Sequence, residues 1–210
     1  MTIYPHLKDF DTPEGHWLDR NDFRPLIQDI YAKHKVQNIL EIGFNIGYSA
    51  SMWLEFDPDK KSHITSVDIG IHKDSVKASE AVKALHGDRF EFILCDSKKV
   101  SNQLKGQLFD MIFIDGDHSG PGIYNDIQLA IRLQVPLILV DDWDENPDTN
   151  NPIKGVCDNM VKENKLSLIK VYNLNSLPTK VALYRNDTIH SQKNTLKRQF
   201  SFLSPKSTRN

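Results

Sequence analysis

Short apolar runs alternate with helix-like segments along most of the chain, and this alternation limits the fold more than any other feature of the sequence. Several of the runs are apolar at consecutive positions, which is typical of strands covered on both faces. The five expected strands are Asn38 to Ile42, His63 to Ile69, Phe90 to Cys95, Met111 to Asp115 and Pro136 to Asp141. Strand and helix taking turns predict right-handed crossovers and a parallel sheet with helices on both faces.

The segments before, between and after these strands have the spacing of helices. The expected helices are Asn21 to His34, Gly47 to Phe56, Asp74 to Leu85, Val100 to Lys105, Pro121 to Leu133 and Pro152 to Glu163. Two further strands, Ser167 to Tyr172 and Lys180 to Tyr184, have only a turn-rich link between them, so we expect an antiparallel hairpin at one sheet edge. The predicted fold is α/β, a doubly wound and mostly parallel sheet of seven strands.

The composition fits one globular domain with extensions. The chain has 210 residues, of which 39% are hydrophobic and 26% are charged. No apolar run reaches the ~20 residues that a membrane helix needs, and the N-terminus lacks the pattern of a secretion signal. Cys95 and Cys157 belong to no Cys-x-x-Cys or Cys/His cluster. We therefore expect a cytoplasmic protein with no membrane partner, no disulfide framework and no zinc site.

The charge is nearly balanced but unevenly distributed. The net charge is -2 and the pI about 6.4, so a nucleic-acid partner is not expected. After Tyr184 the chain is basic, and we interpret this end as a solvated, partly disordered tail. The expected division is an N-terminal segment and helix covering the pocket (1–36), a main domain (37–185) and the tail (186–210). Assembly into a homo-oligomer stays open.

Ligands of an open parallel sheet bind beyond the carboxyl ends of its strands, so the residues there are the candidates for function. After the first strand, Gly43 allows a sharp turn and Asn45 tolerates a left-handed backbone. Gly47 and Ser49 open the next helix, whose N–H groups can hold an anion. The pattern G-x-G-x-x-G fails at Asn45 and Tyr48, which disfavours a nucleotide-dependent oxidoreductase. An ordinary strand-to-helix turn would also account for this segment.

The next two strands end in polar residues. Asp68 is placed to accept hydrogen bonds from a ribose diol, and a helix cap or a solvated carboxylate is the other interpretation. Asp96 and Ser97 follow the third strand, where a carboxylate and a hydroxyl could read an adenine edge. Asp96 could equally cap the short helix after it.

Acidic residues follow the fourth and fifth strands, which we expect to be neighbours. Asp115 and the pair Asp141 and Asp142 would then converge, and carboxylates that close together require a cation, a raised pKa or a basic partner. Oxygen ligands suit Mg²⁺ or a similar hard ion. His118 is the titratable group of this cluster whose ordinary pKa is near neutrality. Turn and cap chemistry is the alternative interpretation, and the convergence of three acids and a histidine favours a functional site.

The chain resembles the class I S-adenosylmethionine-dependent methyltransferases in a series of motifs. In chain order these are EIGFNIGYSA, the acid at Asp68, CDS, FIDGDHS and LILVDDW. Within them the chain is most similar to the small metal-dependent O-methyltransferases of the catechol O-methyltransferase type and to a related bacterial group with a D-G-D-H-S segment. The resemblance runs from about Gln37 to Tyr184 and includes the terminal hairpin.

The resemblance implies roles for individual residues. The methionine part of S-adenosylmethionine would lie against Glu41, Gly43, Asn45, Gly47 and Ser49. Its ribose would be held by Asp68 and its adenine would lie by Asp96 and Ser97, with Asp115 completing the cofactor site. Asp115, Asp141 and Asp142 would bind a divalent metal ion, for which Mg²⁺ is the first candidate. The implied function is O-methylation of a small hydroxylated acceptor, a phenol or a sugar.

Two positions depart from the catechol enzymes. Those enzymes have a lysine three residues after the first metal aspartate and an asparagine after the second, where this chain has His118 and Asp142. Asp142 keeps an oxygen ligand, whereas His118 allows a metal-independent enzyme in which the histidine is the base. Asp115 and His118 are the expected catalytic residues. A non-catalytic cofactor-binding module is a further alternative, which the complete acid cluster disfavours. Trp17, Tyr48 and Trp143 could line the acceptor pocket, although tryptophans are more often core or rim residues.

Overall fold

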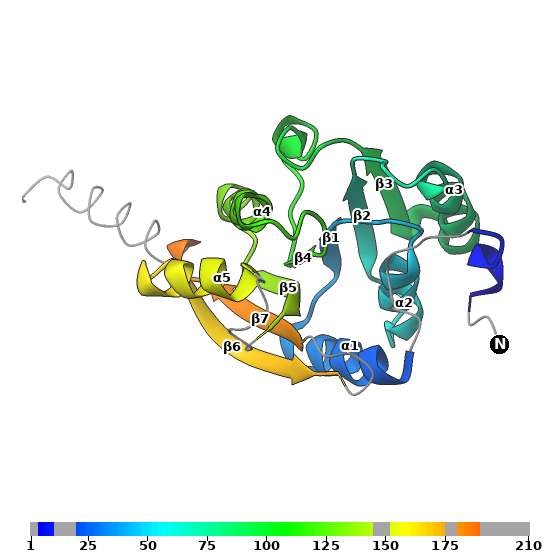
Figure 1. Cartoon of the computed structure of the whole chain (residues 1–210). Helices are drawn as coiled ribbons and strands as arrows, with labels where there is room; N and C mark the ends of the chain where they lie inside the picture. Colours follow the sequence, from blue (N-terminus) through cyan, green and yellow to red (C-terminus); the bar gives the residue numbers. More distant parts are fainter. Residues whose placement is uncertain (1–3, 11–19, 145–151, 175–179, 190–210) are drawn as a thin grey trace, which may run out of the picture.

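One seven-stranded sheet, with strand order β3-β2-β1-β4-β5-β7-β6, runs through the protein (Figure 1). The computed structural model describes residues 4–10, 20–144, 152–174 and 180–189. The strands are β1 (Asn38–Ile42), β2 (His63–Asp68), β3 (Phe90–Leu94), β4 (Met111–Ile114), β5 (Leu137–Trp143), β6 (Leu166–Asn173) and β7 (Lys180–Asn186). Strands β1 to β5 pair in parallel, and β7 pairs antiparallel with both β5 and β6. The predicted fold class is confirmed, including the antiparallel hairpin at one edge.

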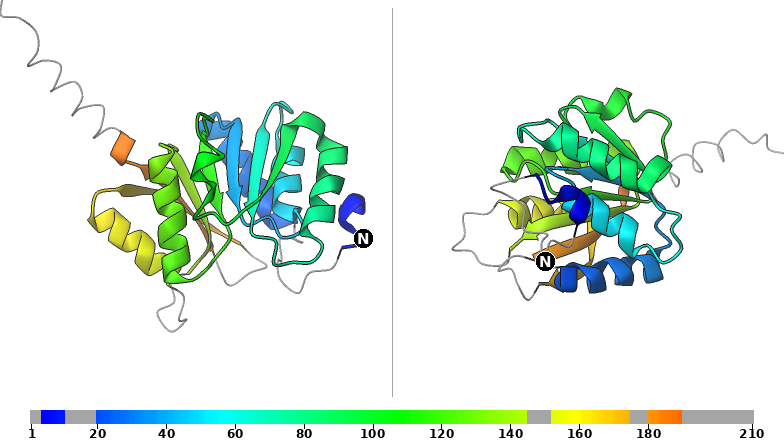
Figure 2. Two further views of the ribbon diagram at one scale, coloured as in Figure 1. Left: turned by 90° about the horizontal axis from the view of Figure 1, so that it is seen from above. Right: turned by 90° about the vertical axis from the view of Figure 1, so that its right-hand side faces the viewer.

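Helices cover both faces of the sheet (Figure 2). The α-helices are α1 (Arg20–His34), α2 (Tyr48–Phe56), α3 (Ser75–His86), α4 (Gly120–Arg132) and α5 (Ile153–Lys162). Three short 3-10 turns accompany them, η1 (Pro5–Leu7), η2 (Gly87–Arg89) and η3 (Val100–Asn102). The helix expected over Val100 to Lys105 is therefore only the 3-10 turn η3. No helix in the described ranges is both long enough and apolar enough to cross a bilayer.

The strands divide their side chains between two apolar cores. Ile39 of β1 packs with α1, α2 and α3 on one face, and its neighbour Leu40 packs with α4 and α5 on the other. Both side chains are fully buried. Burial of one such side chain contributes about 1.5–3 kcal/mol, which is why consecutive apolar residues stabilise a strand covered on both faces.

The order of the strands reverses its direction between β1 and β4. The chain runs outward from β1 through β2 to β3, and then returns to place β4 on the other side of β1. Connections on the two sides of this point leave toward opposite faces, so the carboxyl ends of β1 and β4 are where a ligand fits. The candidate residues stand at these ends and at the ends of β2, β3 and β5.

A β-bulge interrupts β5 where it meets β7. Val140 pairs with Ala182 and Trp143 with Lys180, so β5 has one more residue than β7 across this stretch. Asp142 lies in the bulge with a left-handed backbone, φ +51°. Trp143 is buried and its Nε1 donates a hydrogen bond to the hydroxyl of Tyr184 at 2.9 Å, so this residue belongs to the core and does not line a pocket.

Some expectations cannot be compared with the structure. Trp17 and most of the basic tail lie outside the described residues, so their predicted roles stay predictions. The division of the chain at residues 36 and 185 also stays a prediction. Tyr48 is half-buried and its ring lies 5.7 Å from that of Tyr4, at the start of α2.

Candidate functional site

The turn from β1 into α2 is packed so tightly that only glycine fits its first position. Gly43 has φ +94°, and a Cβ there would lie 1.9 Å from the backbone oxygen of Asp115, at the end of β4. Asn45 and Gly47 are also left-handed, with φ +52° and +84°. The backbone of the turn therefore packs directly against the end of the adjacent strand, and only a residue without a side chain can stand at Gly43.

Asp68, at the end of β2, holds this turn in place through its carboxylate. Oδ2 accepts hydrogen bonds from the backbone N–H groups of Phe44 at 2.8 Å and Asn45 at 2.9 Å. Oδ1 accepts one from Gly70 N at 2.6 Å. Asp68 is largely buried, at 8% exposure. The residue thus lies at the predicted position beside the turn, and it also organises the backbone there, which the sequence analysis did not foresee.

Glu41 is a buried acid below the turn. Its carboxyl accepts hydrogen bonds from the hydroxyls of Ser49, at 2.5 Å, and Ser66. Burial raises the pKa of Glu41 to about 8, although the two serine hydrogen bonds oppose that shift. Glu41 and Ser49 therefore bind each other, and Glu41 joins β1 to β2 and α2. It shapes the pocket from beneath, since it is fully buried.

The loop after β3 places Asp96 and Ser97 beside the end of β2. Cys95 N donates to the backbone oxygen of Asp68 at 2.8 Å, which sets the loop against the ribose position predicted at Asp68. Asp96 Oδ1 accepts Lys98 N at 2.9 Å, so this carboxylate supports the loop. The hydroxyl of Ser97 donates to Asp126 Oδ1, on α4, at 2.7 Å.

The structure brings Asp115 and Asp142 together around His118. Asp115 Oδ1 lies 3.4 Å from His118 Nε2, and Asp142 Oδ2 lies 3.1 Å from His118 Nδ1. The hydrogen bond that His118 donates to Asp115, and then the one that it donates to Asp142, raise the pKa of His118 to about 10. Burial raises the pKa of Asp115. At neutral pH a protonated imidazole therefore lies between two carboxyl groups, and the bulge in β5 turns Asp142 toward it.

A metal ion needs several ligand side chains that converge on one point. Within the described ranges, no group of three acidic, histidine or cysteine side chains is arranged to hold one. Asp115 and Asp142 face the imidazole, whereas Asp141 is buried in β5 at 6% exposure. The donor chemistry nevertheless suits a hard cation, since all three candidates are carboxylates on neighbouring strand ends. A metal ion would need His118 to move from between Asp115 and Asp142.

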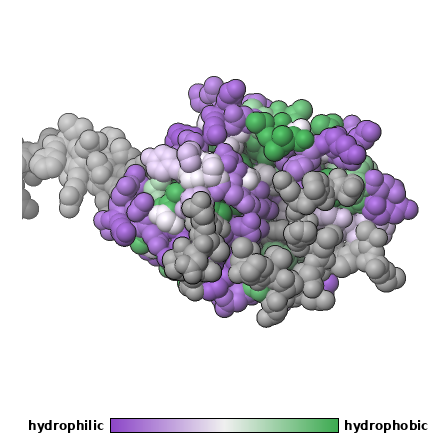
Figure 3. Space-filling view, in the orientation of Figure 1, coloured by the Kyte–Doolittle hydropathy of each residue, from purple (hydrophilic) through white to green (hydrophobic). Residues whose placement is uncertain are grey.

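An apolar patch borders the predicted cofactor site, at the ends of β2 and β3 (Figure 3). Ile69, Ile71 and Leu94 are exposed by 61%, 79% and 57%. Gly70 lies among them, and a Cβ there would meet Leu94 Cδ1 at 2.6 Å. Large apolar side chains exposed next to Asp68 suit contact with a flat ring. These residues were not predicted from the sequence. The available signal was that Ile69 and Ile71, two apolar residues, flank a glycine directly after the strand.

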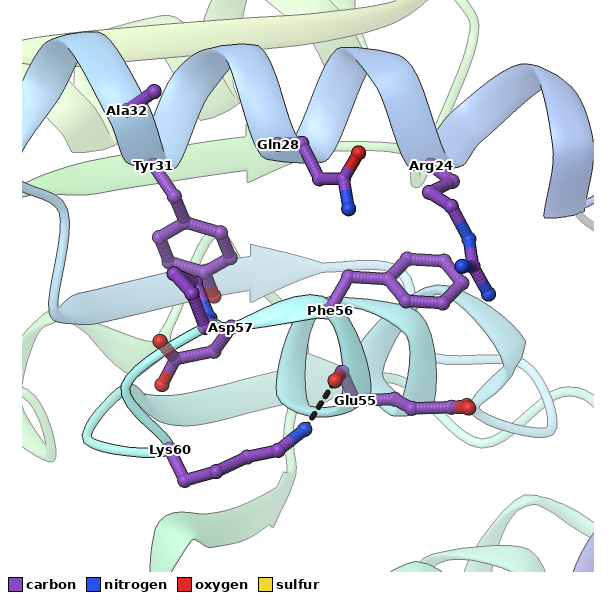
Figure 4. Close-up of a pocket in the computed structure, with 9 residues that line it drawn as sticks. Arg24, Gln28, Tyr31, Ala32, Glu55, Phe56, Asp57 and Lys60 are labelled. Atoms are coloured by element: carbon purple, nitrogen blue, oxygen red, sulfur yellow. Dashed lines mark hydrogen bonds between the residues drawn. The ribbon is translucent and has the colours of Figure 1, made fainter.

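A separate groove lies between α1 and the end of α2 (Figure 4). It has a volume of about 650 Å³, and Arg24 stacks over the ring of Phe56 at 4.4 Å from the ring centre. Asp57, one of the two acids that line it, accepts hydrogen bonds from Ser62 N at 2.7 Å and from Arg89 at 3.2 Å. These contacts support the fold, and the candidate residues at the strand ends lie elsewhere. We therefore place the functional site at the strand ends.

Asp126 is a further residue of the site that was not predicted from the sequence. It is 2% exposed and lies on the buried side of α4 with Ile123 and Ile127. An acid at an apolar position of an amphipathic helix was the available signal, since Asp126 follows Ile123 by three residues. Its partner Ser97 belongs to another segment, which the helix pattern alone does not reveal.

Comparisons with known proteins were made for the sequence and for the fold. Residues 40–143 match a family described as "Methyltransferase domain". Comparison with curated proteins gives no significant match. Among solved structures, the Bacillus cereus O-methyltransferase in complex with S-adenosylhomocysteine is 19% identical, with a TM-score of 0.63 over 86% of this chain and 84% of that one.

Two further structures are similar at the same level. The O-methyltransferase TomG from Streptomyces achromogenes, in complex with S-adenosylmethionine, is 17% identical, with a TM-score of 0.59 over 78% of this chain and 79% of that one. The methyltransferase PaMTH1 from Podospora anserina, bound to S-adenosylhomocysteine, is 20% identical, with a TM-score of 0.58 over 78% and 77% of the two chains. At this identity, the three structures establish the shared fold.

Replacing Gly43 by alanine tests the packing of the turn. We expect Gly43→Ala to lower the free energy of unfolding by at least about 3 kcal/mol, because it combines backbone strain with a clash against Asp115. The matched control is Gly106→Ala, whose φ is +87° with open space around the new Cβ, so it should cost only about 1–2 kcal/mol. Urea unfolding measures both, and equal losses would contradict the close contact.

Replacing Glu41 by glutamine tests the buried acid. The pKa of Glu41 rises from 4.5 to about 8 on folding, so the folded chain holds a proton that the unfolded chain releases between these values. Wild-type stability should therefore fall relative to Glu41→Gln as pH rises from about 4.5 to about 8, by up to about 1.4 kcal/mol per unit. Urea unfolding across this range measures the difference. A constant difference would contradict the raised pKa.

Proposed function

We propose that this chain, which has the fold of the class I methyltransferases, is an S-adenosylmethionine-dependent enzyme that methylates a hydroxyl oxygen of a small acceptor, a phenol or a sugar. The observation that carries the proposal is the pairing of the glycine turn at Gly43 with the acidic cluster around His118. Both features stand at the carboxyl ends of β1, β4 and β5, the edge at which open parallel sheets bind their ligands.

The residues present suit the cofactor. Gly43 has no side chain, so a ligand can approach the backbone there. Asp68 offers carboxylate lone pairs, and the exposed Ile69 and Leu94 offer an apolar surface. We propose that Asp68 holds the ribose hydroxyls, Ser97 reads the adenine, and the turn from Gly43 to Gly47 holds the methionine part. When bound, S-adenosylmethionine supplies an electrophilic methyl group on a sulfonium.

The acidic cluster has two tasks in this proposal. First, two carboxylates and one imidazolium carry a net charge of -1, which favours a cationic donor nearby. Second, methyl transfer to oxygen releases the hydroxyl proton, and the cluster of Asp115, His118 and Asp142 can take it up as a unit. Holding the acceptor oxygen in line with the methyl group would contribute several kcal/mol more.

We propose a first form of the reaction that is assisted by a divalent metal ion, with Mg²⁺ as the first candidate. Asp115, Asp141 and Asp142 would hold it, and it would lower the pKa of an acceptor hydroxyl. The position of His118 between Asp115 and Asp142 favours the second form of the same function, in which no metal is needed. The two forms differ in one measurable requirement, the need for the metal ion.

Removing the Asp68 carboxylate tests cofactor binding. We expect Asp68→Ala to weaken S-adenosylhomocysteine binding at least about tenfold, because it frees the N–H groups of Phe44 and Asn45 and leaves the ribose hydroxyls without an acceptor. Calorimetric titration measures the affinity, with Asp88→Ala as the control at an exposed acid. Unchanged affinity in Asp68→Ala would contradict the assigned role.

A chelator distinguishes the two forms of the reaction. For the metal-assisted form, we expect EDTA to lower methyl transfer to a catechol or sugar panel at least about tenfold, and Mg²⁺ to restore it. Asp141→Asn should lose the stimulation by Mg²⁺ and keep its affinity for S-adenosylhomocysteine. Full turnover in EDTA would reject the metal and support the form that uses Asp115 and His118 alone. Absence of any O-methylated product would reject the proposed acceptor class.

A further inference from the structure

A buried acid on α4 contacts the loop that is proposed to read the adenine. Asp126 is 2% exposed, and its Oδ1 accepts the hydrogen bond of the Ser97 hydroxyl at 2.7 Å. Its Oδ2 is also buried and has no partner among the described residues. Burying a carboxyl group in an apolar helix face is costly, so a role for it is expected.

The hydrogen bond fixes which way the Ser97 hydroxyl can act. A hydroxyl has one proton to donate and two lone pairs that accept. Because the proton of Ser97 goes to Asp126, only the lone pairs remain for a ligand. Ser97 itself is half-buried, so its oxygen borders the surface.

The loop that carries Ser97 is held at a second point. Lys98 Nζ lies 3.6 Å from Asp117 Oδ2, in the segment between β4 and α4. Asp96 supports the same loop through Lys98 N. The position of the Ser97 oxygen is therefore set by contacts with the β4–α4 region from two sides.

We propose that Asp126 is a positioning residue that keeps Ser97 as a hydrogen-bond acceptor and thereby selects a purine with an exocyclic amino group. This inference rests on the proposed function, in which Ser97 lies beside the adenine. Adenine offers an amino group at this edge, whereas hypoxanthine offers a carbonyl oxygen, which would face the lone pairs of Ser97. A site built for one hydrogen bond rejects an analogue that leaves its polar group unpaired.

The test compares S-adenosylhomocysteine with S-inosylhomocysteine by calorimetric titration of the full chain. The titrations are run at pH 8, above the pKa of about 6 to which burial raises Asp126, so that its carboxylate can accept. The neighbouring charged groups are Asp117, Lys98 and Asp96. Wild type should prefer the adenine compound at least about tenfold.

Three variants separate positioning from simple structural support. In Asp126→Leu the Ser97 hydroxyl is free to turn and donate to the carbonyl, so the preference should fall to about threefold or less. Ser97→Ala should lose the preference to the same degree. Asp126→Asn is the conservative control, because its amide oxygen can still accept the Ser97 proton, and it should retain most of the preference.

Each outcome decides the matter. If Asp126→Leu is folded, as judged by thermal unfolding, and keeps the wild-type ratio, the inference is wrong. If Asp126→Leu does not fold, Ser97→Ala decides, and an unchanged ratio in that variant also overturns the inference. Wild type that fails to bind S-adenosylhomocysteine would overturn the proposed function itself, whereas wild type that binds both compounds equally would overturn only the role of Asp126.

Discussion

The site depends on the close approach of the β1–α2 turn to the end of β4. Gly43 meets the backbone of Asp115 so closely that no side chain fits between them, and the carboxylate of Asp68 holds the following N–H groups in place. This contact determines the distance between the proposed cofactor cradle and the acidic cluster. If the turn moved away, the methyl donor and the acceptor would lose their common geometry, and with it the several kcal/mol that alignment would contribute to such a transfer.

Two acids near this contact have opposite surroundings and therefore different roles. Glu41 is sealed below the turn, where burial raises its pKa and the hydroxyls of Ser49 and Ser66 pair with it. Asp115 lies at the rim, where His118 can share its proton. The first acid supports the architecture of the pocket, whereas the second is available to chemistry. The same residue type thus serves two purposes, according to its access to ligand and solvent.

Much of the fold follows from local pattern, because strands covered on both faces and helices with apolar stripes leave clear periodicities. Strand β1 has the predicted bounds, and the left-handed backbone expected at Asn45 is present. The bulge that turns Asp142 toward His118 was not predictable, since it depends on pairing with β7, about forty residues later in the sequence. The bond between Ser97 and Asp126 likewise joins two segments whose meeting depends on tertiary packing.

The central claim is that the methyl donor lies over the turn at Gly43, between Asp68 and the cluster around His118. A crystal structure of the chain with S-adenosylhomocysteine tests this claim most directly. We predict the ribose within hydrogen-bond distance of Asp68 and the sulfur facing the side of Asp115 and His118. Density for the ligand at another place, such as the groove between α1 and α2, would contradict it.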